Sequence, residues 1–110
     1  MSDASTNTAS SFAPSQTIQY TTPTTGSTIT ATAARDLKIL INPAGALLAL
    51  TLALNGSPQN GDIVTIGASQ AVTTFSMTGG TVVGPLTSLA IGTFAQYMYS
   101  SDASEWFRIG

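Results

Sequence analysis

Apolar and polar residues alternate with a period of two along most of this 110-residue chain. Residues 16–22 place Ile18 and Tyr20 between threonine and glutamine residues, and residues 36–42 alternate in the same way. This period belongs to a β-strand, and the runs are separated by the glycine, proline and asparagine residues that favour turns. Further strands are expected at 27–31, 62–67, 71–77, 81–83, 93–99 and 105–109, and residues 86–91 are expected to form a short strand or an extended edge.

The segment 46–54, ALLALTLAL, combines good helix formers with the pattern of a strand. Gly45 and Gly56 bound it and leave room for about nine residues, which is short for a helix and normal for a strand. We therefore predict a strand. Both of its faces are nearly apolar, so both are expected to be buried, one in the subunit core and the other against a neighbour.

About nine short strands at regular spacing are typical of a β-sandwich or a small barrel. The sequence predicts an all-β fold, as a small antiparallel β-sandwich or a jelly-roll-like barrel. Residues 1–15 are small and polar and are expected to form an extended or flexible N-terminal arm, whereas residues 16–110 form a single β-domain. The runs 93–99 and 105–109 are expected to pair as a terminal hairpin.

Charged residues make up only 7% of the chain, against roughly 25% in ordinary globular proteins. Eighteen threonines and thirteen serines compensate in part, because hydroxyl groups keep a surface hydrated. The other remedy is to bury surface against further copies of the chain, since the cores of interfaces are depleted in charge. The residues expected in such an interface, or in the core, are Leu48, Leu50, Leu52, Leu54, Leu86, Leu89 and Ile91.

The chain contains neither histidine nor cysteine, so nucleophile–histidine pairs and imidazole or thiolate metal sites are excluded. The five acidic residues show no spacing that would aim two carboxylates at one pocket. We predict that the protein is not an enzyme and takes no cofactor, metal or small-molecule substrate.

Two further classes of partner do not fit the composition. The three cations, Arg35, Lys38 and Arg108, are too few for a nucleic-acid interface. The strongly apolar stretch 44–54 is much shorter than the ~20 residues of a membrane-spanning helix. We therefore expect neither nucleic acid nor a membrane as a partner.

Tyr97, Tyr99 and Trp106 form an aromatic group near the C-terminus. Such a group is a candidate platform for surface recognition, because aromatic rings stack on sugars and bases. The alternative is a set of cross-strand pairs inside the core, which is the commoner role of aromatics in facing strands.

The second half of the chain resembles a β-domain that recurs in bacteriophage head-decoration proteins and in tail-fibre or spike proteins. The resemblance covers roughly residues 36–110 and lies in the order of the elements. An aliphatic strand is followed by a loop, two alternating strands, a Gly-Gly turn and an aromatic hairpin. The segments are Leu48-Ala-Leu-Thr-Leu52, Asn60-Gly-Asp-Ile-Val-Thr-Ile66, Gln70-Ala-Val-Thr-Thr-Phe75, Gly79-Gly-Thr-Val-Val-Gly-Pro-Leu-Thr-Ser-Leu89, Gly92-Thr-Phe-Ala-Gln-Tyr-Met-Tyr99 and Glu105-Trp-Phe-Arg-Ile-Gly110.

This resemblance implies a homotrimeric structural protein of the virion. The implied role is capsid decoration: the protein would bind the major capsid protein on the capsid exterior and stabilise the head. The alternative is a short head or tail fibre, or a spike, that binds a host receptor. The capsid contact is expected in the arm and the strand that follows it, at Phe12, Pro14, Ile18 and Tyr20.

Overall fold

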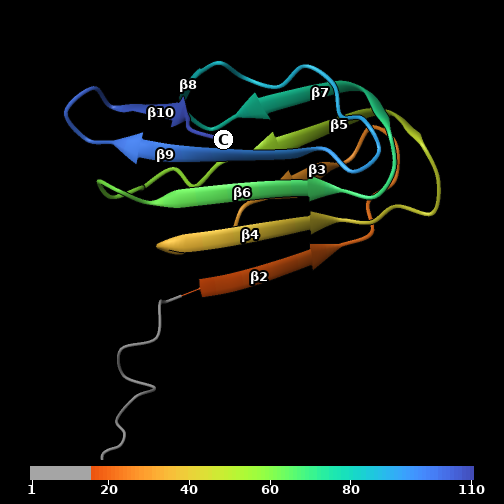
Figure 1. Cartoon of the computed structure of the whole chain (residues 1–110), viewed down its shortest axis with the longest axis horizontal. Helices are drawn as coiled ribbons and strands as arrows, with labels where there is room; N and C mark the ends of the chain where they lie inside the picture. Colours follow the sequence, from red (N-terminus) through yellow and green to blue (C-terminus); the bar gives the residue numbers. More distant parts are fainter. Residues whose placement is uncertain (1–15) are drawn as a thin grey trace, which may run out of the picture.

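The computed structural model describes residues 16–110, which form nine strands in two sheets (Figure 1). A six-stranded sheet has the order β2-β4-β6-β9-β10-β8, and a three-stranded sheet has the order β3-β5-β7. The strands are β2 (Gln16–Thr21), β3 (Thr28–Thr30), β4 (Asp36–Ile41), β5 (Leu47–Ala53), β6 (Ile63–Ala68), β7 (Val72–Thr78), β8 (Thr81–Val83), β9 (Phe94–Ser100) and β10 (Glu105–Arg108).

The chain winds as a parallel β-solenoid of about three turns. Each turn contributes one strand to each sheet, so β2 and β3 form the first turn, β4 and β5 the second, and β6 and β7 the third. Successive turns pair in parallel: Gln16 lies beside Asp36, and Asp36 beside Ile63. The same holds in the other sheet, where Thr28 lies beside Thr51.

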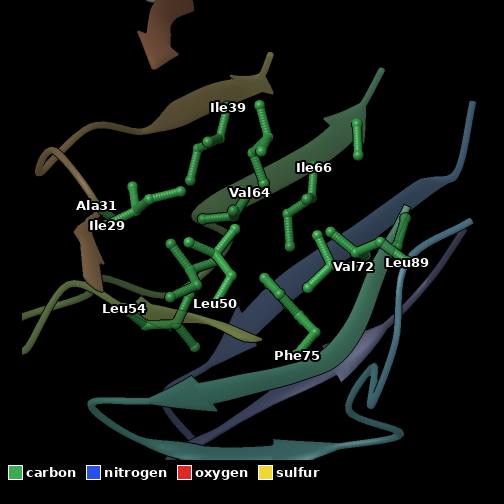
Figure 2. Packing of buried hydrophobic residues seen from close by; sticks show 14 of the residues in the cluster. Ile29, Ala31, Ile39, Leu50, Leu54, Val64, Ile66, Val72, Phe75 and Leu89 are labelled. Carbon is green, nitrogen blue, oxygen red and sulfur yellow. The ribbon is translucent and has the colours of Figure 1, made fainter. Parts of the chain in front are cut away.

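Aliphatic side chains from successive turns stack between the two sheets and form the core. Figure 2 shows Ile39 and Ile66 from the six-stranded sheet pointing toward Leu50 and Phe75 from the three-stranded sheet. All four are at most 2% exposed. The alternating strands thus supply the buried apolar area that stabilises the fold.

The last third of the chain closes one end of the solenoid. Strand β9 runs antiparallel to β6 along its free edge, and β10 returns beside β9 as a hairpin, as predicted. Residues 87–89 run along the edge of β7, where Phe75 donates its backbone N–H to Thr87 and Val72 bridges Leu89. Both edges of the third turn are therefore covered.

At the opposite end, strand β2 of the first turn reverses the usual alternation, whereas β3 keeps Ile29 in the core. The inward positions of β2 are polar, and the apolar Ile18 and Tyr20 point outward with 53% and 61% of their surface exposed. The amide of Gln19 crosses the interior, donating to the Thr30 carbonyl at 2.8 Å and accepting from the Thr32 N–H at 2.9 Å. Polar residues thus close this end of the core.

The prediction of an all-β fold is confirmed, and 47–53 is a strand rather than a helix. The predicted antiparallel sandwich or jelly-roll-like barrel is wrong, because the first three turns pair in parallel. A period of two is common to parallel and antiparallel strands and does not encode the partner. Of the two alternatives for 86–91, the structure shows an extended edge: these residues form no named strand, and Leu89 makes a single bridge to Val72. The predicted arm 1–15, with Phe12 and Pro14, lies outside the described residues.

Alkaline pH is expected to destabilise this fold through Tyr97. Its buried hydroxyl donates to the Gly84 carbonyl at 2.8 Å. Burial raises the pKa of the phenol above its ordinary value of 10.0, against smaller lowering effects from Arg108 and the Leu86 backbone. Since the folded pKa exceeds the unfolded one, this contribution is complete below pH 10.0 and is lost as pH rises through the folded pKa.

The test compares urea unfolding of the wild-type protein and Tyr97→Phe below and above pH 10.0. The variant loses one hydrogen bond, about 1 kcal/mol, at neutral pH. Its stability is expected to fall less steeply in alkali, because the other tyrosines are common to both proteins. Equal slopes in the two proteins would contradict the assignment to Tyr97.

Candidate interaction surface

The leucine-rich strand β5 lies mainly in the core and not on an outer surface. Leu50, Leu52 and Leu54 are at most 4% exposed, and Leu89 packs with them. Leu86 is half-buried against the same core. Leu48 and Ile91, by contrast, are more than 70% exposed. Alternation breaks at Leu48 because its neighbour Leu47 turns inward, so Leu48 does not join Leu50, Leu52 and Leu54 on the inner side of β5.

The aromatic group at the C-terminus is also internal. Tyr97 is 0% exposed and Trp106 is 2% exposed. Tyr99 and Trp106 are direct partners on β9 and β10, and their ring centroids lie 5.3 Å apart. The structure therefore places these side chains in cross-strand packing, and Tyr97 and Trp106 are not available as a stacking platform.

The one buried carboxylate of residues 16–110 is engaged in holding a loop. Asp62, 2% exposed, accepts hydrogen bonds from the Arg35 guanidinium at 3.0 Å and from the Gln59 backbone N–H at 2.8 Å. Among the described residues, no three side chains of the metal-binding types gather at one point. None of these residues forms a helix with the length and hydropathy of a membrane span.

Exposed apolar side chains gather on the outer face of the six-stranded sheet. Ten large apolar side chains are exposed in residues 16–110, and the strand register places seven of them on this face. Ile109 follows β10 and donates its backbone N–H to the Gln96 carbonyl, which places it on the same face. Large groups of exposed apolar residues mark interaction sites on soluble proteins. We call the following set the apolar face: Ile18, Tyr20, Leu40, Val83, Phe94, Met98, Phe107 and Ile109.

The register aligns these residues in rows across the sheet. One row runs from Tyr20 through Leu40 and Gly67 to Phe94, each paired with the next. A second row joins Ile63, Met98, Phe107 and Val83 on β6, β9, β10 and β8. Neither row crosses all six strands with apolar residues, and the outward row between them holds Ile18 followed by Lys38, Thr65 and Gln96. The apolar face therefore consists of two apolar rows separated by a mainly polar row.

Gly67 opens a groove in the first row. A groove of about 380 Å³ lies over this glycine, with Leu40 and Phe94 among its walls. A Cβ at Gly67 would meet only the Thr93 carbonyl, at 4.0 Å, so the missing side chain leaves open space rather than relieving a clash. At the edge of the row, Asn42 donates to the Tyr20 hydroxyl at 2.7 Å, which holds the exposed ring in place.

The apolar face carries few charges. Asp36 and Lys38 lie side by side on β4 and form an ion pair at 3.1 Å. Glu105, half-buried at the start of β10, is the other acidic residue on this side of the sheet. A partner would therefore meet a surface with few charges and one net negative charge, that of Glu105.

The outer face of the three-stranded sheet has the opposite character. Its register aligns Thr28, Thr51 and Ser76 in one row, and Thr30 and Thr78 flank Ala53 in the next. Small hydroxyl-bearing side chains of this kind interact well with water. The two outer faces are therefore chemically distinct, one hydroxyl-rich and one apolar.

The sequence contains one indication of the apolar face: some strands carry apolar residues on both sides. Leu40, Phe94 and Met98 interrupt the polar positions of β4 and β9, so these strands are apolar on both sides. Ile18 and Tyr20 belong to the same face, although they were predicted to contact a capsid from the arm region. Two-sided apolar strands can be assigned to one surface only when the register is known.

Comparison with known proteins does not assign the chain to a family. No family model and no curated protein matches it.

Proposed function

We propose that this protein is a non-enzymatic structural protein of a bacteriophage particle, which binds the outside of the capsid and associates with copies of itself. The observation that supports self-association is the apolar face: eight exposed apolar side chains on one sheet, opposite a hydroxyl-rich face. Exposed in isolation, such a face is an aggregation hazard, whereas a partner that covers it stabilises the particle. The capsid as the binding partner follows from the resemblance alone.

The proposed role has a simple thermodynamic basis. A protein that binds only the assembled shell shifts the assembly equilibrium toward that shell by mass action. Linked copies bind more tightly than single ones, because the second contact forms at high effective concentration. A protein that acts by binding alone needs no catalytic group for this task, and the buried Asp62 already accepts hydrogen bonds from Arg35 and Gln59.

The test is cosedimentation of the purified protein with particles of its phage that lack it. We expect saturable binding to these shells and none to the shells of an unrelated phage. Immunogold electron microscopy of the same particles then locates the protein. Label over the head supports capsid decoration, label at the tail supports the fibre or spike alternative, and absence of binding to either contradicts the proposed function.

A further inference from the structure

The apolar face is large enough for a specific interface. The whole outer face of the six-stranded sheet, its polar row included, covers roughly 500 Å², since the strands hold three to seven residues each at about 3.3 Å per residue and lie about 4.8 Å apart. Two such faces in contact bury roughly 1,000 Å², which is the lower bound for a biological interface. The partner that this area fits is therefore one flat sheet of equal size, and a second copy of the chain supplies one.

Electrostatics permits contact between two identical faces. Asp36 and Lys38 neutralise each other at 3.1 Å, so bringing two copies together buries no unpaired charge at this position. Glu105 leaves one net negative charge on the face, at the start of β10 opposite Ser100 and at the other end of β9 from Phe94. A strongly charged partner would find little complementary charge on the apolar face.

The shape of the face determines how two copies can fit. Gly67 and Phe94 are direct partners on the neighbouring strands β6 and β9. A two-fold axis that runs along the strands between β6 and β9 exchanges these two positions between facing copies. Each copy would then place its exposed Phe94, 56% accessible, over the Gly67 groove of the other. An interface of this type is self-complementary, because a contact from i to j is matched by one from j to i.

We propose that two copies of this chain pack face to face through their apolar faces, with Phe94 of each copy seated in the Gly67 groove of the other. The inference rests on the self-association in the proposed function and adds its surface and its symmetry. It replaces the three copies implied by the resemblance with two, because a single flat face is satisfied completely by one identical face. Such a dimer leaves the hydroxyl-rich face of both copies outward.

The main test is sedimentation velocity of the wild-type protein and the variant Gly67→Glu over a range of concentrations. The wild type is expected at twice the 11.2 kDa subunit mass. Gly67→Glu places a charge in the groove without backbone strain, since its φ is not positive and its Cβ has space. Its dissociation constant is expected to rise at least about tenfold. Ser76→Glu adds the same charge to the hydroxyl-rich face and should behave as wild type.

A second measurement does not depend on Gly67→Glu folding. The chain has no cysteine, so Leu40→Cys and Ser76→Cys each carry a single thiol. Maleimide labelling at Leu40→Cys is expected to be at least about tenfold slower in the dimer than after dilution, because the partner covers this position. Labelling at Ser76→Cys should not depend on concentration.

Four outcomes would overturn the inference. They are a single subunit at every concentration, a mass of three subunits, a Gly67→Glu dimer as stable as wild type, and unprotected Leu40→Cys. If the wild type is monomeric and Gly67→Glu abolishes its binding to shells, the apolar face contacts the capsid instead. A normal dimer that fails to bind shells, by contrast, would contradict the proposed function and leave this inference intact.

Discussion

Replacing Trp106 by alanine is expected to destabilise the protein by about 3–5 kcal/mol, the usual cost of truncating a buried aromatic side chain. Trp106 is 2% exposed and lies between Val82 of β8 and Tyr99 of β9. Its ring is 5.3 Å from that of Tyr99, and its indole lies close to Gly80. Truncation would leave a cavity where β8, β9 and β10 meet. Urea unfolding at one fixed protein concentration measures the loss.

Trp106→Phe is the matched control, because it keeps an aromatic ring against Tyr99 and removes less volume. We expect a smaller loss for this variant, since conservative changes in core volume are tolerated best. Equal stability of Trp106→Ala and the wild type would show that the terminal hairpin contributes nothing to the cooperative fold. That result would contradict the role assigned to β10 in closing the solenoid.

Replacing Gly79 by alanine is expected to cost about 2–5 kcal/mol, from backbone strain and overpacking together. Gly79 turns the chain from β7 into β8 with a φ of +85°, a conformation that L side chains rarely adopt. A Cβ there would lie 2.5 Å from the carbonyl oxygen of Leu54 and 2.9 Å from its nitrogen. These are backbone atoms, and the Leu54 N–H is bonded to the Thr78 carbonyl at 2.8 Å, so moving them breaks the ladder.

Gly61→Ala separates strain from collision. Gly61 has nearly the same φ, +88°, but a Cβ there meets no atom within 4 Å. This variant should lose only the stability that corresponds to the strained backbone conformation, about 1–2 kcal/mol. Urea unfolding of the two variants under identical conditions gives the difference. If Gly61→Ala is as unstable as Gly79→Ala, the close approach of Leu54 is not the cause.

The two outer faces explain how a chain with so few charges manages its surface. Hydroxyl groups on β3, β5 and β7 face water, whereas the six-stranded sheet presents apolar side chains. The reversed alternation in β2 extends the apolar face to this edge strand of the six-stranded sheet, with Ile18 and Tyr20 pointing outward. Polar residues on its inner side, Gln19 above all, close the end of the core. Strand β2 thereby closes the end of the core with one side and contributes to the apolar face with the other.

The low charge led to a prediction of self-association, and the leucines were assigned either to that interface or to the core; the structure places most of them in the core. Leu50, Leu52 and Leu54 are needed between the sheets, where they face the stacked side chains of the six-stranded sheet. Most of the exposed apolar side chains lie on the other sheet, at positions such as Leu40 and Phe94. The hydropathy of a strand shows how apolar it is. Only the pairing register shows on which surface of the protein its outward side chains lie. Gly67, which opens the groove, has no hydropathic signature at all.

The strands themselves were determined by the sequence alone, because alternation and turn residues act over a few neighbours. The Gly79-Gly80 turn and the β9–β10 hairpin belong to the same local class. The parallel solenoid was decided by tertiary structure, since Gln16, Asp36 and Ile63 lie side by side although a full solenoid turn of chain separates each from the next. Parallel and antiparallel partners accept the same alternation, so only packing of the whole core selects between them and brings Leu40, Gly67 and Phe94 into one row.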